Sequence, residues 1–167
     1  MRRNIALIKG GTYNFTHCTV ASYSNNYIQH KDPVLQVSNF DATNAIKALE
    51  AAFRNCIFWG ENGIVDNEIA VNKAVNTGAT AYSVNFSYNL WKLQAVPPTL
   101  TTNQFNITPP SPLFDSIDVS RQYYNFRLRN DSPAKNKGVS TAIVIDLDGK
   151  PRSVPVGQPD LGCFEKQ

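Results

Sequence analysis

The stretch Phe53-Arg54-Asn55-Cys56-Ile57-Phe58 decides the fold, because its pattern occurs three times along the chain. The other two copies are Phe15-Thr16-His17-Cys18-Thr19-Val20 and Phe86-Ser87-Tyr88-Asn89-Leu90-Trp91. Each copy has Phe first, Cys or Asn fourth and a large apolar residue sixth. An internal repeat of this kind indicates an architecture in which similar units stack on their neighbours.

The spacing within each copy requires a bend. In an unbroken strand, the first and sixth side chains would point to opposite faces and could not share a core. A bend at positions two and three, where His17, Asn55 and Tyr88 stand, lets positions one, four and six point inward. Asn and His enter the left-handed backbone conformation of tight bends more readily than most residues. Stacked copies would form one ladder of Phe side chains and another of Cys and Asn side chains, with successive rungs about 4.8 Å apart. This arrangement predicts an all-β parallel β-helix.

The distances between the copies indicate side loops. Phe15 and Phe53 are 38 residues apart, and Phe53 and Phe86 are 33 residues apart, which is long for bare rungs. We expect a loop inserted in each rung, and such loops are where function would lie. The 167 residues fit one domain, with β-helix rungs and side loops in 1–94 and a crossing loop and C-terminal cap in 95–167. Five prolines between 97 and 112 predict that this crossing loop does not continue a sheet.

The composition excludes several classes of protein. Charged residues make up 17% of the chain and the net charge is +3, without a stripe of Lys and Arg, so we expect no nucleic-acid partner. No apolar run is long enough for a transmembrane helix or a signal peptide. Cys18 and Cys56 share one inward position of successive rungs, which favours buried, reduced thiols over a disulfide.

The first expected strand, Asn4 to Ile8, begins almost at the first residue. A β-helix end without a cover would expose strand edges and apolar side chains, which natural proteins normally protect. We therefore expect either end-to-end self-association or further N-terminal rungs that this chain lacks.

Several segments of the last third resemble the closing part of a known family. They are Pro112 to Asp115, Tyr124 to Leu128, Asp131 to Gly138, Asp146 to Arg152 and Pro159 to Glu165. Together with the repeats, they resemble right-handed parallel β-helix (pectate-lyase-like) surface proteins of the Bacteroidetes type, which often carry a choice-of-anchor domain. The last block usually ends Gly-Ala-Tyr-Glu in that family, so Cys163 and Phe164 are departures from it.

The resemblance implies a right-handed β-helix and an extracellular or cell-surface location. It does not imply one reaction, since this scaffold serves many roles. Polysaccharide lyases on it combine calcium-binding carboxylates with a base in one groove. The best candidates for such a group are Asp66, Glu68 and Lys73, although a solvated strand end explains them more simply. An alternative function is therefore part of a polysaccharide lyase or hydrolase whose active site lies mostly on rungs missing here.

Asp146, Asp148 and Gly149 resemble the start of a calcium loop, but Gln158 stands where the closing Glu would be. The sequence thus requires no cofactor and allows calcium only at Asp146 and Asp148. The alternative is that these carboxylates bind backbone amides in turns.

Exposed aromatic residues suggest a binding role for the chain. Trp59 follows the inward Phe58 and should point outward, and Tyr13, Tyr23 and Tyr27 cluster near the first rung. Such rings can stack on sugars, or they can pack beneath side loops. We therefore expect a non-catalytic module that binds carbohydrate, a polysaccharide or glycan, or serves as a scaffold.

Overall fold

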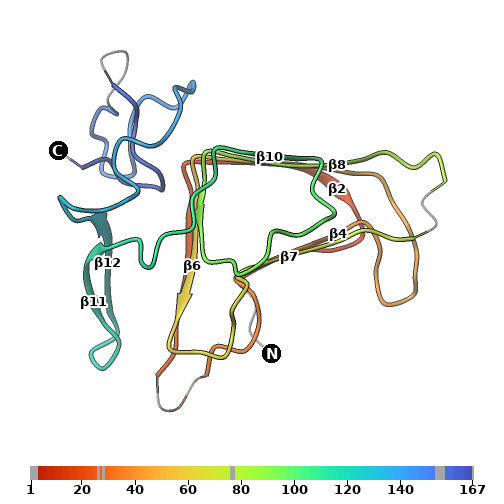
Figure 1. Cartoon of the computed structure of the whole chain (residues 1–167), viewed down its shortest axis with the longest axis horizontal. Coiled ribbons are helices and arrows are strands. Elements are labelled where there is room, and N and C mark those ends of the chain that lie inside the picture. The colour runs from red at the N-terminus through yellow and green to blue at the C-terminus, as the bar shows by residue number, and fades with distance from the viewer. Residues whose placement is uncertain (1–3, 26, 28, 76–77, 153–156, 167) are drawn as a thin grey trace.

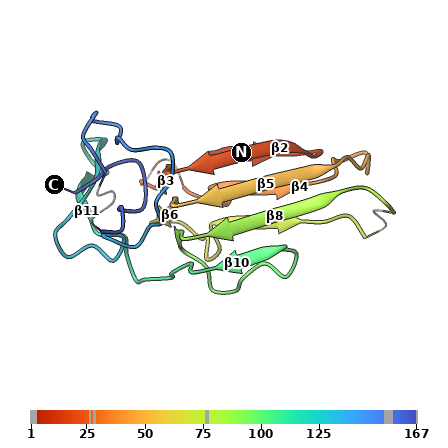
Figure 2. The ribbon, with the colours of Figure 1, turned by 90° about the horizontal axis from the view of Figure 1, so that it is seen from above.

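A computed structural model describes residues 4–25, 27, 29–75, 78–152 and 157–166 (Figure 1). Within these residues the chain forms strands and turns and contains no helix. Most strands pair in parallel and belong to three sheets, each of which takes one strand from each of the first three passes of the chain (Figure 2). The fold is thus all-β with mostly parallel, stacked strands.

The three parallel sheets are named here A, B and C. Sheet A contains β1 (Ile5–Leu7), β4 (Leu35–Ser38) and β7 (Ile69–Asn72). Sheet B contains β2 (Gly11–Thr16), β5 (Leu49–Arg54), β8 (Tyr82–Ser87) and β10 (Thr102–Gln104). Sheet C contains β3 (Thr19–Tyr23), β6 (Ile57–Glu61) and β9 (Leu90–Trp91). Among the described residues, β1, β2 and β3 are the outermost strands of their sheets at one end of the stack.

The predicted bend is confirmed. His17, Asn55 and Tyr88 have φ angles of 53°, 55° and 54°, and each joins a strand of sheet B to a strand of sheet C. In the register of sheet B, Phe15 pairs with Phe53 and Phe53 with Phe86. Their rings stack with centroids 5.2 Å and 4.4 Å apart, so the expected Phe ladder is present.

The fourth position also forms the expected ladder. Asn89 Nδ2 donates to Phe53 O at 3.0 Å, one rung back, and its Oδ1 accepts the amide of Cys56 at 2.9 Å. Cys56 Sγ lies 3.5 Å from Phe15 O in the equivalent place. The side chain at position four therefore links each rung to the one before it. The three cysteines are free thiols.

One prediction about the crossing loop was wrong. Residues 102–104 form β10, which pairs in parallel with β8, inside the segment expected to leave the sheet. The prolines that suggested a loop lie on either side of this short strand, at 97 and 98 and from 109 onward, so they remove none of its hydrogen bonds. Phe105 has φ 53° and Asn106 Nδ2 donates to Phe86 O, so this strand begins a fourth copy of the bend.

The C-terminal part of the chain packs against the outer face of sheet C. It begins with an antiparallel hairpin of β11 (Phe114–Asp118) and β12 (Tyr123–Leu128) and continues through turns to residue 166. Figure 1 shows this part beside β6. It buries a second apolar cluster that includes Ile57, Leu90 and Leu161, separate from the core between the sheets. The segment predicted to cap the stack therefore covers one side of it, while Leu93 and Leu100 pack on the core near β10.

Candidate functional site

A hollow of about 570 Å³ lies between the loop that follows β3 and the turn of the β11–β12 hairpin. A second hollow of about 310 Å³ adjoins it and shares Asn25 and Gln122 as lining residues. We call the two hollows together the tyrosine groove. Hydroxyl, amide and aromatic side chains line most of it: Asn4, Ser22, Tyr23, Ser24, Asn25, Tyr27, Gln29, Asn62, Ser120, Gln122 and Tyr124. The remaining described lining residues are His30 and Val119, so this lining carries no Lys, Arg, Asp or Glu.

One wall of the groove is held by a buried His–Glu pair. His30 Nε2 lies 2.8 Å and 2.9 Å from the two carboxylate oxygens of Glu68, which begins the pass into β7. The Ser24 hydroxyl accepts the His30 amide, and His30 O accepts the amide of Ile64 at 3.1 Å. These contacts fix both ends of the loop that carries Asn25 and Tyr27.

Glu68 is fully buried, and this burial raises the pKa of its carboxyl even though His30 and the Val34 amide favour the charged form. Gly60 makes room for the pair, because a Cβ there would collide with the Glu68 carboxylate and lie 2.6 Å from His30 Nε2. Lys92 Nζ donates to Gly60 O at 3.0 Å and brings a positive charge to the same region. The wall of the groove that this loop forms is therefore held by contacts with residues from three rungs.

The opposite wall is the hairpin turn, which Asp118 organises. Its Oδ1 accepts the Ser120 hydroxyl at 2.6 Å and the Arg121 amide at 3.0 Å. The Ser120 hydroxyl, with help from backbone amides, lowers the pKa of the Asp118 carboxyl. Gln122 follows with φ 55°, which closes the turn and brings its side chain to the junction of the two hollows.

Aromatic rings form the floor of the smaller hollow. The Tyr23 ring lies with its centroid 6.0 Å from that of Tyr124 and 6.3 Å from that of Phe126. Burial, and then the Glu61 charge, raises the pKa of the Tyr23 hydroxyl, so it stays a neutral donor and acceptor. Tyr124 is 38% exposed and Tyr27 is 95% exposed, so both rings can meet a ligand.

The structure brings together two of the four aromatic residues that the sequence suggested for sugar binding. Tyr23 and Tyr27 line the groove. Tyr13 lies elsewhere, packed on the inner core, with its hydroxyl donating to Gly10 O. Trp59 points away from the inner core as expected, but it is only 3% exposed because the C-terminal part covers it, and Nε1 donates to Glu61. No pattern in the sequence indicated Tyr124 or Gln122 as lining residues, because they come from a segment about a hundred residues further on.

The two carboxylates suggested for calcium have protein partners. Asp146 is buried and accepts the amides of Asp148, Lys150 and Glu165 at 2.8–2.9 Å. Burial alone would raise the pKa of the Asp146 carboxyl. The three amides stabilise its charged form more strongly, so the pKa is lowered. Asp148 pairs with Arg127, whose Nε lies 2.8 Å from Oδ2. Across the described residues, no group of three or more His, Cys, Asp or Glu side chains could hold a metal ion.

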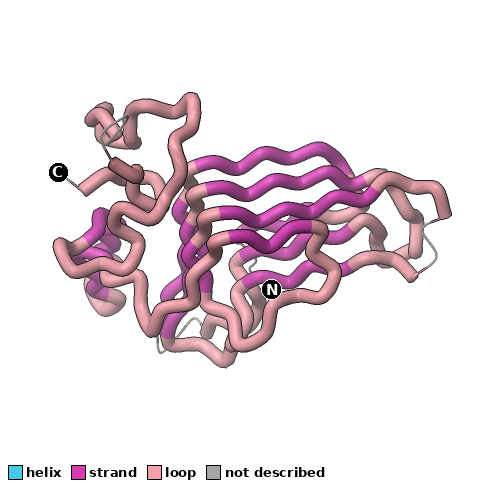
Figure 3. The backbone as a smooth tube through the Cα atoms, turned by 45° about the horizontal axis from the view of Figure 1, so that its top comes forward, coloured by secondary structure: helices cyan, strands magenta, loops and turns pink. Residues whose placement is uncertain are grey.

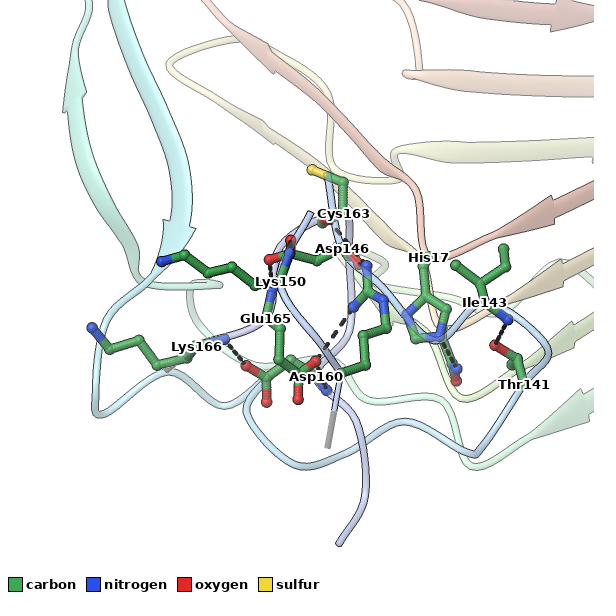
Figure 4. A network of polar contacts seen from close by, with 12 residues as sticks. His17, Thr141, Ile143, Asp146, Lys150, Asp160, Cys163, Glu165 and Lys166 are labelled. Carbon is green, nitrogen blue, oxygen red and sulfur yellow. Dashed lines mark hydrogen bonds and ion pairs between the residues drawn. The ribbon is translucent and has the colours of Figure 1, made fainter. Parts of the chain in front are cut away.

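Figure 4 shows the buried polar network around Asp146. Arg152 and Glu165 form an ion pair at 3.4 Å, and Arg152 also donates to the carbonyls of Gly162 and Cys163. Asp160 accepts the amides of Asn136 and Lys166, both at 2.7 Å. These side chains hold the C-terminal turns in place, next to His17 at the first bend.

The acidic and basic residues suggested for a lyase do not form one group. Glu68 is buried against His30, and Lys73 Nζ lies 4.7 Å from the centre of the Tyr82 ring. Asp66 is exposed and lies in neither hollow of the tyrosine groove.

No family model, curated protein or solved structure matches this chain. Among the described residues, no helix is long and apolar enough to cross a membrane.

Proposed function

We propose that the three parallel sheets form a right-handed β-helix of the pectate-lyase-like kind, and that the chain is a non-catalytic carbohydrate-binding module of a secreted or cell-surface protein. The observation that carries the binding proposal is the lining of the tyrosine groove. Amides, hydroxyls and tyrosine rings, with neither carboxylates nor lysines or arginines among the described lining residues, suit the hydroxyl groups and apolar ring faces of a neutral glycan.

The shape of the groove supports a chain-like ligand over a small molecule. Two open hollows lie in a row and share lining residues, rather than forming one enclosed cavity. Tyr27 lines one hollow and Tyr124 lines the other, so each hollow has an exposed aromatic ring. A glycan of several units would contact both rings, and tyrosine gives a large contact area at a small cost in conformational entropy.

The test is affinity electrophoresis through gels that contain neutral polysaccharides such as xylan, β-glucan and mannan, with polymer length measured afterwards. We expect retardation by at least one polymer without any shortening of it. Tyr27→Ala and Tyr124→Ala should each weaken retardation by roughly five- to tenfold, the range of an aromatic anchor in an interface.

Tyr123→Ala is the matched control, because Tyr123 neighbours Tyr124 and is exposed but lies outside both hollows. Equal losses of retardation in Tyr123→Ala and Tyr124→Ala would show that the tyrosine groove is not the binding site. An absence of retardation by every polymer would favour a scaffold role, and shortened polymer would show that the chain is catalytic.

A further inference from the structure

Figure 3 shows the connections between the stacked strands as loops. One of them, residues 62–68, leads from β6 in sheet C to β7 in sheet A. It begins with Asn62 and Gly63, the single Asn-Gly pair of the sequence. Such a pair is reactive, because glycine has no Cβ that would keep its amide nitrogen away from the side-chain carbonyl of the preceding asparagine.

The backbone requires both residues of the pair. Asn62 has φ 59°, a conformation that Asn adopts more readily than most residues. Gly63 lies against the loop that carries Tyr27, and a Cβ at Gly63 would collide with the carbonyl oxygen of His30. The next amide, that of Ile64, donates to the same oxygen at 3.1 Å. The close approach of two loops therefore fixes a reactive pair in the sequence.

The reacting groups of this pair have no protein partner in the described part of the chain. There the Gly63 amide donates no hydrogen bond, and the Asn62 side chain makes none. Both residues are exposed, so water and hydroxide reach them. A hydrogen-bonded amide would have to leave its acceptor before its nitrogen could attack a carbonyl carbon. The nucleophile and its target are thus both available.

Asn44 is the opposite case on a similar backbone. It is exposed and has φ 59°, as Asn62 does. The amide of the residue after it, Ala45, donates to Asp41 Oδ1 at 3.2 Å, and Ala45 carries a Cβ. The nitrogen that would attack the Asn44 side chain is therefore both occupied and hindered.

We propose that Asn62 is a site of spontaneous deamidation, in which the Gly63 nitrogen attacks Cγ of Asn62. The new bond closes a succinimide ring, the Gly63 amide proton passes to hydroxide, and the bond from Cγ to Nδ2 breaks. Nδ2 takes a proton from water and leaves as ammonia. Water then opens the ring, at Cγ to give an aspartate or at the main-chain carbonyl to give an isoaspartate. Overall, one water is consumed and one ammonia is released.

The reaction changes the tyrosine groove, because Asn62 lines its larger hollow. Either product places a carboxylate among described lining residues that include no Asp, Glu, Lys or Arg. The isoaspartate also adds a methylene to the main chain where Gly63 meets His30, so it should loosen the contact between the two loops. The reaction depends on Asn62 and Gly63 alone, and it does not rest on glycan binding by the groove.

The test is peptide mapping by mass spectrometry after the whole chain and a free peptide of residues 61–64 have been kept side by side in mildly alkaline buffer. We expect Asn62 of the folded chain to be converted at most about tenfold more slowly than in the peptide, since an exposed loop opens at little cost. An isoaspartyl methyltransferase should label the same segment, and Asn44 should remain an amide. An Asn62 that stayed intact after the peptide had been converted, or an Asn44 converted as fast as Asn62, would overturn the proposal.

One variant separates the structural argument from the sequence pair itself. Ala45→Gly creates a second Asn-Gly pair, whose amide still has Asp41 as its acceptor. This pair should react about tenfold more slowly than Asn62 in the same molecule, and equally fast in strong denaturant. Equal rates in the folded chain, or a difference that persisted in denaturant, would show that the unbonded Gly63 amide does not set the reactivity.

A second variant links the reaction to the groove. Asn62→Gly keeps the positive φ and removes the side-chain amide, so it should show no conversion in this segment. In the unmodified chain, the NMR signals of the Tyr27 and Ile64 amides should shift as Asn62 is converted. The same shifts in Asn62→Gly would assign the change to another residue and overturn the proposal.

Discussion

The side-chain amide of Asn55 forms a pair of hydrogen bonds with the main chain of Val139, 84 residues further along. Nδ2 donates to Val139 O at 2.7 Å, and Oδ1 accepts the Val139 amide at 3.0 Å. Asn55 is fully buried and has φ 55°. One residue therefore makes the bend between β5 and β6 and also fastens the C-terminal part of the chain to it.

Substitutions of Asn55 should separate these two roles. Asn55→Gly keeps the bend but leaves the partly buried main-chain groups of Val139 without their partner, which should lower the free energy of unfolding by about 2–3 kcal/mol. Asn55→Ala also places a Cβ at positive φ and should cost about 1 kcal/mol more. Denaturant unfolding measures both. Asn44→Gly is the control at an exposed residue with φ 59°, and it should change stability little. Equal stability of the Gly and Ala variants would show that the bend is not strained.

The repeats were sufficient to predict the strand register because their geometry is encoded in a few residue types. Phe at position one and a bend at position three fix which face of each strand turns inward. The stacked rings of Phe53 and Phe86 and the left-handed Asn55 follow directly from that pattern. These are contacts between equivalent residues of neighbouring rungs, so their identity repeats in the sequence.

The fourth copy of the bend was not predicted because it lacks the aromatic first position. Asn103 stands where the other copies have Phe, and prolines surround the segment. All four copies share a positive φ at position three, which Phe105 has in the fourth copy. Only the last two copies have Asn at position four, where Asn106 Oδ1 accepts the amide of Asn89 at 2.9 Å.

The tyrosine groove could not be predicted because its two walls come from unrelated parts of the chain. Tyr23 belongs to the first rung, and Tyr124 belongs to a hairpin outside the repeats. The same hairpin region explains the burial of Trp59, whose outward direction was predicted but whose cover was not. The repeat pattern carries no information about which later segment packs on the outer face of sheet C.

Asn89 should be the most sensitive position of the inner polar ladder. Its side chain bonds to the Cys56 amide, to Phe53 O and to Asn106 Oδ1, and it is fully buried. Asn89→Ala leaves these groups unpaired and should lower the free energy of unfolding by about 3 kcal/mol. Cys56→Ala removes only weak thiol contacts and should cost less. If thermal unfolding showed the two variants equally stable, the amide ladder would not support the fold.

Gly60→Ala should disrupt the loop wall of the tyrosine groove. The added Cβ would meet the Glu68 carboxylate, which is fully buried and cannot move away without breaking its contact with His30. We expect a loss of about 1–3 kcal/mol in the free energy of unfolding, as for an overpacked core. Chemical-shift changes should extend to Asn25 and Tyr27. In Gly78→Ala the added Cβ would meet no heavy atom within 4 Å beyond its chain neighbours, so its loss, about 1 kcal/mol, reports the strain of a side chain at φ 56° and not a collision. A Gly60→Ala protein as stable as the unmodified chain would contradict the close approach of Gly60 to Glu68.

The stability of the fold should fall on mild acidification because of His17. The Asn55 amide is oriented by Val139, so its Nδ2 donates to His17 Nε2, at 2.9 Å, and the ring is neutral. Burial, and then the nearby Arg152 charge, lowers the His17 pKa to about 4, although the carbonyls of Asp160 and Gly162 oppose the shift. An unfolded His takes up its proton at about pH 6.5. Between about pH 6.5 and 4 the unfolded state therefore binds more protons than the folded state. The stability present above about pH 6.5 is lost as the pH falls through this window. The loss is about 2 kcal/mol after allowance for solvent around the ring.

The comparison that isolates His17 is with His17→Asn, which keeps a residue suited to positive φ but has no titrating ring. Denaturant unfolding at several values between pH 7.5 and pH 4 should show the unmodified protein losing its advantage over the variant as the pH falls. Carboxyl groups contribute equally to both proteins, so they cancel in the difference. A difference in stability that stayed constant across this range would mean that the buried ring titrates normally, and that neither its burial nor Arg152 acts on it as the structure indicates.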